Sequence, residues 1–165
     1  MDRRQFVFGI VAAAALSAGA RDGRAECGEL TSNEFVRELY EKQARLHAAN
    51  TPLTADEFHA LFASDLRKLM QSPRRTPNNM PVGPLLNAFF GWGVLPGTEI
   101  KVEKVALVSG NYEGPATVGI DLKYRGESRK VLVHAVRENE VWLVANIIYD
   151  SGKSLVSHYR AITAR

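Results

Sequence analysis

The spacing of hydrophobic residues changes once along this chain, and the change divides it into a helical first half and a stranded second half. Residues 31–50 and 54–72 place hydrophobic residues three and four apart, the spacing that gathers them on one face of a helix. Each stretch begins with a threonine followed three residues later by a glutamate, the capping box that starts a helix. We also expect a short third helix over residues 85–90.

In the second half, hydrophobic residues recur at every second position. Residues 116–124 alternate between hydrophobic and polar, which is typical of a strand with one buried and one solvated side. Residues 131–136 and 141–148 are hydrophobic on both sides, so we expect two central strands covered on both faces. The Arg-Gly-Glu sequence at residues 125–127 predicts the turn between strands. Residues 155–162 have helical spacing again, and either they or a second copy of the chain would cover the outer face of the sheet.

Helices followed by antiparallel strands indicate an α+β fold. We expect two or three N-terminal helices packed on a curved four-stranded antiparallel sheet, with a short C-terminal helix. Residues 26–165, about 140 in number, suffice for one hydrophobic core, so we interpret them as a single domain.

The first 25 residues have the features of a cleaved export signal. Arg3 and Arg4 precede a hydrophobic stretch that is too short for a permanent membrane helix, and small residues lead to a cleavage position after Ala25 or, alternatively, Ala20. The Arg-Arg-Gln-Phe motif resembles the twin-arginine translocation signal, and the general secretory route is the alternative. The sequence therefore predicts a periplasmic or secreted protein without stable membrane insertion.

The charge of the expected mature domain argues against nucleic acid as a partner. Removing the four arginines and two aspartates of residues 1–25 from the 21 basic and 18 acidic residues leaves 17 and 16, a net charge of +1. A nearly neutral domain has no overall field that would attract a phosphate backbone. The single cysteine excludes an intramolecular disulfide, so the core must stabilise the fold.

Four short segments carry a resemblance to known proteins: FVRELY at residues 35–40, LFASDLRKL at 61–69, WLVANIIY at 142–149 and GKSL at 152–155. They resemble an uncharacterised family of exported or lipid-anchored bacterial proteins, which is similar to the nuclear transport factor 2-like superfamily. The resemblance implies a cone in which the sheet wraps around the helices and leaves a pocket. It does not imply one activity, since the superfamily includes isomerases, dehydratases, ligand binders and dimerisation modules. Relatives often carry aspartates where this chain has Ala145-Asn146, so a carboxylate role is absent there.

Five residues are candidates for binding a ligand in such a pocket. Asn146 is a polar residue expected on one strand face with Trp142, Val144 and Ile148, and its structural interpretation is an amide that ties down a neighbouring loop. Asp65 either points into the pocket or pairs with a basic neighbour. The aromatic candidates are Tyr40, Trp92 and Tyr149.

Nothing in the sequence predicts a cofactor or a metal. The histidines are scattered without metal-binding spacing, at positions 47, 59, 134 and 158. We therefore favour a non-catalytic domain that binds a small apolar ligand or a protein partner on the concave side of the cone. One alternative is an isomerase or dehydratase with Asp65 or a histidine as general base, and another is a homodimeric module without a ligand.

Overall fold

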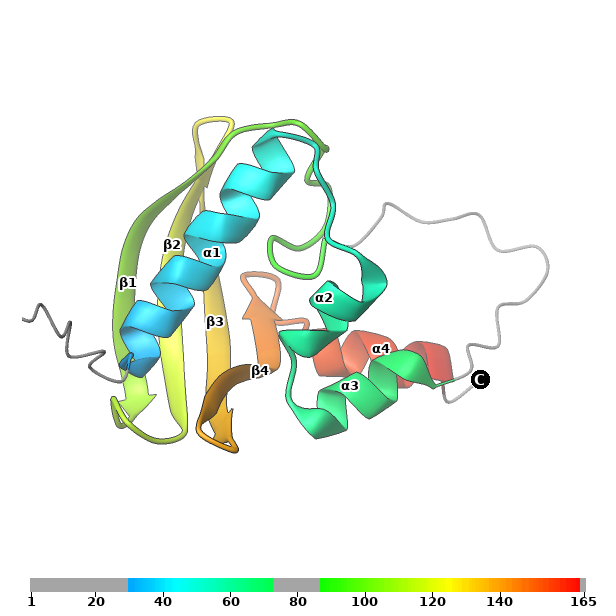
Figure 1. The fold of residues 1–165 in the computed structure, drawn as a ribbon. Coiled ribbons are helices and arrows are strands. Elements are labelled where there is room, and N and C mark those ends of the chain that lie inside the picture. The colour runs from blue at the N-terminus through cyan, green and yellow to red at the C-terminus, as the bar shows by residue number, and fades with distance from the viewer. Residues whose placement is uncertain (1–29, 73–86, 164–165) are drawn as a thin grey trace, which may run out of the picture.

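The structure, a computed structural model, describes residues 30–72 and 87–163 (Figure 1). The expected export signal lies outside these residues. Helices α1 (Ser32–Ala48), α2 (Ala55–Ala60) and α3 (Ser64–Gln71) precede four strands, and α4 (Leu155–Thr163) ends the described chain. The α+β class and the short C-terminal helix are confirmed. None of the helices within the described ranges combines the length and hydrophobicity needed to cross a bilayer.

Both predicted capping boxes are present. At the start of α1, the Glu34 backbone N–H donates to the Thr31 hydroxyl at 3.3 Å, and the Glu34 carboxylate accepts from the Thr31 backbone N–H at 2.8 Å. Thr54 and Glu57 repeat the arrangement at α2. In each case the threonine and the glutamate satisfy backbone donors that lack a partner in the first turn of a helix.

Two helix predictions are wrong in detail. The single helix expected over residues 54–72 is broken between α2 and α3, because residues 61–63 bond to a strand instead of continuing the helix. Within the described part of residues 85–90, the chain forms a turn rather than a helix. Asn87 and Gly91 exchange backbone hydrogen bonds of 3.1 and 2.8 Å and close this turn.

The four strands form one antiparallel sheet in sequence order: β1 (Ile100–Gly110), β2 (Ala116–Tyr124), β3 (Glu127–Glu138) and β4 (Val141–Tyr149). The alternation predicted for β2 is confirmed, because every second residue from Ala116 to Tyr124 is buried. Arg125 and Gly126 make the predicted turn between β2 and β3, and both have a positive φ, of 52° and 86°. Two consecutive positive φ values suit the right-handed twist of a hairpin.

The expectation that β4 is a central strand is wrong, because β4 lies at the edge of the sheet. The edge is covered where the helices break. The Val144 backbone N–H donates to the Leu61 carbonyl at 3.0 Å, and its carbonyl accepts from the Ala63 N–H at 2.9 Å. The hydrophobic residues of β4 are thus explained by cover from the α2–α3 segment and from α4, which packs on β4.

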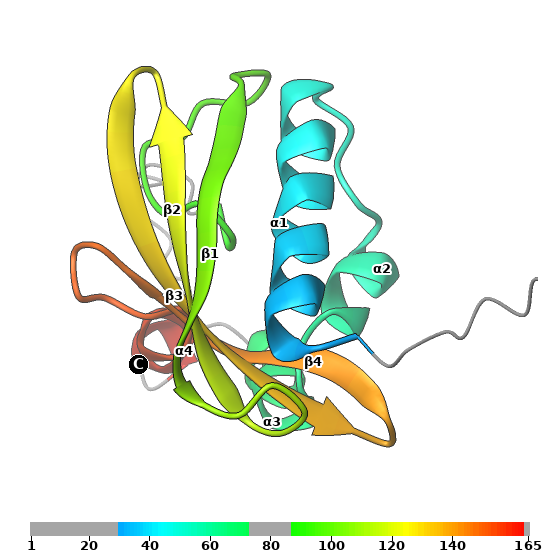
Figure 2. The same ribbon diagram turned by 90° about the vertical axis from the view of Figure 1, so that its left-hand side faces the viewer.

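Helix α1 lies across the inner face of the sheet, and its contacts are mostly with β1 (Figure 1). Tyr40 and Val36 of α1 are fully buried there with Ile120, Val133 and Ile147. Figure 2 shows β4 swinging away from the direction of β1 and β2 towards α3, so the sheet is strongly curved. The described interior is a continuous packed core, and it positions the ends of α1 and α4 around an opening beside the sheet.

Candidate functional site

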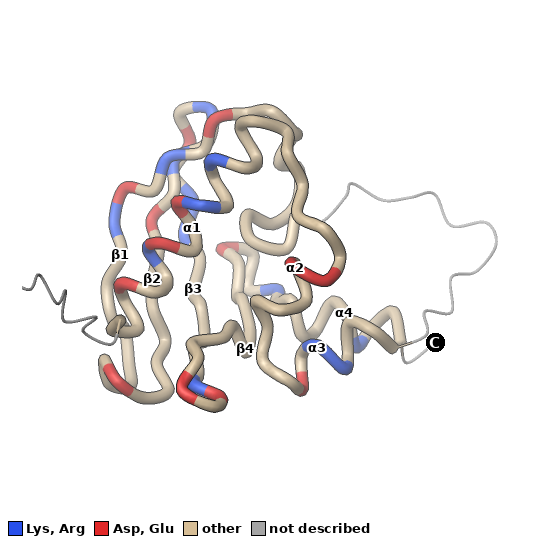
Figure 3. Tube along the Cα trace, viewed as in Figure 1, with Lys and Arg blue, Asp and Glu red and all other residues tan. Residues whose placement is uncertain are grey.

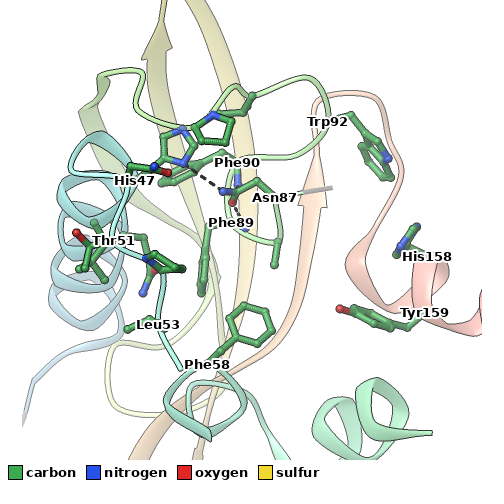
Figure 4. Close-up of a pocket in the computed structure, with 17 residues that line it drawn as sticks. His47, Thr51, Leu53, Phe58, Asn87, Phe89, Phe90, Trp92, His158 and Tyr159 are labelled. Atoms are coloured by element: carbon green, nitrogen blue, oxygen red, sulfur yellow. Dashed lines mark hydrogen bonds between the residues drawn. The ribbon is translucent and has the colours of Figure 1, made fainter. Parts of the chain in front are cut away.

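A cleft of about 690 Å³ opens between the C-terminal half of α1, α2, the segment of residues 87–96 and α4 (Figure 4). The described residues that line it are Gln43, Leu46, His47, Asn50, Thr51, Pro52, Leu53, Phe58, Asn87, Ala88, Phe89, Phe90, Trp92, Val94, Pro96, His158 and Tyr159. None of these residues belongs to the four strands. The inner face of the sheet is filled by core side chains, and the cleft lies beside it rather than on it.

The floor of the cleft is the turn that begins at Asn87. Its side-chain oxygen accepts hydrogen bonds from the backbone N–H groups of Phe89 and Phe90, at 3.0 and 3.1 Å. Gly91 closes the turn with a φ of 86°, a backbone conformation that residues other than glycine rarely adopt. The turn thereby presents two phenylalanine rings next to each other, and Phe89 packs on Phe58 across the cleft floor at 6.1 Å between ring centroids.

Two buried tyrosines hold this turn from behind. The Tyr40 hydroxyl donates to the Phe89 carbonyl at 3.1 Å, and the Tyr149 hydroxyl donates to the Ala88 carbonyl at 2.6 Å. Burial raises the pKa of both hydroxyls well above the ordinary value for tyrosine. Both groups therefore remain protonated donors, and one anchors the turn to α1 while the other anchors it to β4.

One wall of the cleft carries three polar side chains, Gln43, His47 and Asn87. His47 Nε2 lies 2.9 Å from the Leu95 carbonyl, so this nitrogen carries the proton and donates it. His47 Nδ1 then accepts from the Asn87 amide, at 3.5 Å (Figure 4). Gln43 lies one helical turn before His47 on the same face of α1, and its side-chain nitrogen is buried without a hydrogen-bond partner.

The opposite wall is aromatic and comes from α4 and Trp92 (Figure 4). The Trp92 ring packs edge to face on Tyr149 at 5.2 Å and on His158 at 6.0 Å between centroids. The Lys153 ammonium lies 5.3 Å from the centre of the Trp92 ring, a cation–π distance. This wall is thus a set of rings held against one another, with Tyr159 beside them.

The lining residues that the structure describes include no Asp, Glu, Lys or Arg. The segments bordering the cleft, residues 46–55 and 87–98, contain no such residue either, and Figure 3 shows charges of both signs on the helices and strands around them. Across the described ranges, no three His, Cys, Asp or Glu side chains gather in a way that could hold a metal ion. The surface offered by the cleft is apolar and aromatic with a few amide and imidazole groups.

The five candidates from the sequence fall in different places. Trp92 lines the cleft, whereas Tyr40 and Tyr149 lie behind its floor and hold it. Asp65 lies on the surface of α3 with its side chain 99% exposed, 3.9 Å from the Lys68 ammonium. Asp65 therefore does not line the cleft. It pairs with a basic neighbour on the surface, which was the second of the two interpretations of its sequence position.

Asn146 is not on the strand face expected for it. The pairing of β3 with β4 shifts at Ala145, so that Val144 pairs with Ala135 while Asn146 pairs with His134. Because such a bulge reverses the alternation of faces, Asn146 points away from the face that buries Trp142 and Val144. Its side-chain oxygen accepts from the Val156 backbone N–H at 3.1 Å. Asn146 thus ties the first turn of α4 to the sheet, which positions one wall of the cleft.

The sequence analysis missed Gln43, His47 and Asn87 as site residues. Helical spacing places the first two on the face of α1 that also carries Tyr40, but it does not mark them as site residues. Asn87 was hidden because it falls in a segment interpreted as helix. The turn it makes depends on one side-chain oxygen bonded to two backbone N–H groups, which hydrophobic periodicity does not reveal.

No family model, curated protein sequence or solved structure matches this chain. The interpretation of the cleft therefore depends on its own geometry and chemistry.

Proposed function

We propose that this protein is an exported, non-catalytic binding module that holds a small, largely apolar molecule in the cleft between α1, residues 87–96 and α4. The observation that carries the proposal is the cleft itself. Its volume of about 690 Å³ falls within the roughly 300–1,000 Å³ of small-molecule sites, and it shows their combination of aromatic rings with a few polar groups.

The chemistry of the lining supports binding rather than catalysis. The described lining holds no carboxylate, lysine or arginine, and both ring nitrogens of His47 are engaged in hydrogen bonds. The second histidine of the lining, His158, packs its ring against Trp92 and Tyr159. A general acid or base needs a free proton site within reach of a substrate. Asp65, the base considered in the enzyme alternative, is on the surface of α3. We also propose that the chain is similar to the ligand binders of the nuclear transport factor 2-like superfamily, as its short sequence segments imply.

A fluorescence titration with N-phenyl-1-naphthylamine, an uncharged probe that brightens in apolar sites, tests the proposal. We expect saturable binding of one probe per chain. Thr51 is an exposed residue of the cleft, so the larger side chain of Thr51→Trp should fill the cleft. The affinity for the probe should fall at least about tenfold, which corresponds to roughly 1.4 kcal/mol of binding free energy. Val108→Trp is the matched control, since Val108 is 59% exposed on β1 and does not line the cleft. Equal binding by the two variants would refute the cleft as the site.

Export is tested separately. Fusing residues 1–30 to a reporter enzyme that is active only outside the cytoplasm should give activity in a bacterial host. If the twin-arginine route is used, replacing Arg3 and Arg4 by lysine should abolish that activity. Activity that survives the replacement would assign the general secretory route, and no activity from the unaltered fusion would remove export from the proposal.

A further inference from the structure

The polar wall of the cleft has hydrogen-bond donors that the protein does not use. Gln43 is 7% exposed and lines the cleft, and its Nε2 atom has no hydrogen-bond partner. Buried side-chain amides nearly always find a partner, because an unpaired N–H loses its bond to water and gains nothing in return. Nε2 is itself buried, so it reaches the cleft once the side-chain amide turns, and a ligand atom there can then complete its bonding.

The side-chain acceptors of the two neighbouring polar residues, His47 and Asn87, already accept hydrogen bonds within the protein. Asn87 Oδ1 accepts from two backbone N–H groups, and His47 Nδ1 accepts from Asn87 Nδ2. Asn87 Nδ2 has a second hydrogen beyond the one directed at His47. When the Gln43 amide is turned so that Nε2 faces the cleft, Gln43 and Asn87 both present donors, and this wall fits a ligand that brings an acceptor.

The lack of charged side chains on the described lining narrows the ligand further. A buried carboxylate or ammonium needs an opposite charge, and the lining residues within 30–72 and 87–163 supply no fixed charge to meet it. An uncharged acceptor such as a carbonyl oxygen loses far less on leaving water, and one or two amide N–H groups satisfy it.

We infer that the cleft takes an uncharged molecule with a ring-based apolar body and a carbonyl oxygen, and that Gln43 Nε2 donates a hydrogen bond to this oxygen. This inference rests on the proposed function, since it names the ligand class of the same cleft. The apolar body lies between Phe89 and Phe58 on one side and Trp92 on the other. A rotation about the last torsion of the Gln43 side chain turns Nε2 towards the ligand.

Three naphthalene probes of similar shape test the inference by calorimetry on the protein expressed from residue 26. They are 2-acetylnaphthalene with a carbonyl, 2-isopropylnaphthalene without one, and 2-naphthoate with a charge. We expect the ketone to bind at least as tightly as the more hydrophobic isopropyl compound, and the naphthoate to bind at least about tenfold more weakly than the ketone.

Replacing Gln43 removes the donor. Gln43→Met keeps the length of the side chain, so the affinity ratio of ketone to isopropyl compound should fall about fivefold to tenfold, the effect of one lost hydrogen bond. Lys42→Met is the matched control, because Lys42 is the exposed neighbour on α1 and does not line the cleft, and it should leave the ratio unchanged. If Gln43→Met does not fold, the side-chain amide resonances of Gln43 in the unaltered protein give the answer, since they should shift with the ketone and not with the isopropyl compound.

The outcomes separate the two proposals. If none of the three probes binds, the proposed function fails and the inference falls with it. If the probes bind but the ratio is the same in the Gln43→Met variant, or the Gln43 resonances do not distinguish the probes, only the inference is wrong. Tighter binding of the naphthoate than of the ketone would also overturn it, because it would show an anion site.

Discussion

Replacing Tyr149 by phenylalanine should loosen the floor of the cleft without disturbing the packing around it. The substitution removes the hydroxyl that donates to the Ala88 carbonyl at 2.6 Å and keeps the ring that packs against Trp92. The hydroxyl and its acceptor are buried, and loss of one partner of a buried hydrogen bond costs about 1–3 kcal/mol. We take about 2 kcal/mol as the expected loss in the free energy of unfolding.

The measurement is thermal unfolding followed by circular dichroism. For a domain of this length, 1 kcal/mol corresponds to roughly 3–5 °C in Tm, so Tyr149→Phe should lower Tm by about 6–10 °C. Tyr112→Phe is the matched control, since Tyr112 is 51% exposed, and its Tm should stay within about 2 °C of the unaltered protein.

Base-induced unfolding tests the same bond independently. Because burial raises the pKa of Tyr149 above the ordinary value of 10.0, the unfolded chain loses the phenolic proton at lower pH than the folded chain. The stability linked to this group is therefore complete below pH 10 and declines as the pH rises above it. Tyr149→Phe should make this decline less steep. A Tm change below about 2 °C together with an unchanged alkaline decline would show that the turn is not held by this hydroxyl.

Three further predictions follow from other contacts. Gly91→Ala should destabilise the protein by about 1–3 kcal/mol in chemical denaturation, because φ is 86° and the added Cβ would lie 3.2 Å from the tyrosine ring of β4; a neutral result would contradict the turn geometry. Asp65→Asn should change probe affinity less than about twofold and stability by less than about 0.5 kcal/mol, because its ion pair is exposed; loss of binding would place the site elsewhere. NMR titration should give Glu34 a pKa below its ordinary 4.5, because the Thr31 backbone N–H and hydroxyl bond the carboxylate. Thr31→Ala removes the hydroxyl and keeps the backbone N–H, so it should raise this pKa in part. The stability from this pair is present above pH 4.5 and is lost as the pH falls through the lowered pKa, so an unshifted titration would refute the capping box.

Local patterns predicted most of the elements because their causes lie within a few residues. The capping boxes at Thr31 and Thr54 involve side chains three residues apart, and the alternation of β2 needs only one buried face. The hairpin turn at Arg125-Gly126 likewise depends on local backbone geometry. The starts of both helices, the extent of β2 and the hairpin turn could therefore be stated from the sequence.

Contacts between distant segments decided the parts that could not be predicted. The break between α2 and α3 exists because Leu61 and Ala63 bond to Val144, some 80 positions away in the chain. The same pairing covers the edge of β4, so a strand that is hydrophobic on both sides need not be central. The bulge at Ala145 then moves Asn146 to the other face, and a single inserted residue of this kind leaves no mark in hydrophobic spacing.

The candidate site could be predicted only in part from the sequence, because it too depends on contacts between distant segments. Trp92 was found because aromatic residues often line cavities, but the roles of Tyr40 and Tyr149 became clear only with their bonds to the turn. Gln43 stands out only once its burial and lack of a partner are known. Hydrogen-bond satisfaction is a property of the folded molecule and cannot be counted along a chain.

The separation of the cleft from the strands has a consequence for how this protein can change. Every described lining residue comes from a helix or a connecting segment, so the wall can be rewritten without touching the backbone pairing of the sheet. Thr51 and Leu53 line the cleft without belonging to the core, so substitutions there would change which ligands bind and cost little stability. Phe89 belongs to both the lining and the core, so substitutions there would change ligand binding and stability together. The architecture thus offers a scaffold for designed sensors in which recognition and folding are adjusted by different sets of mutations.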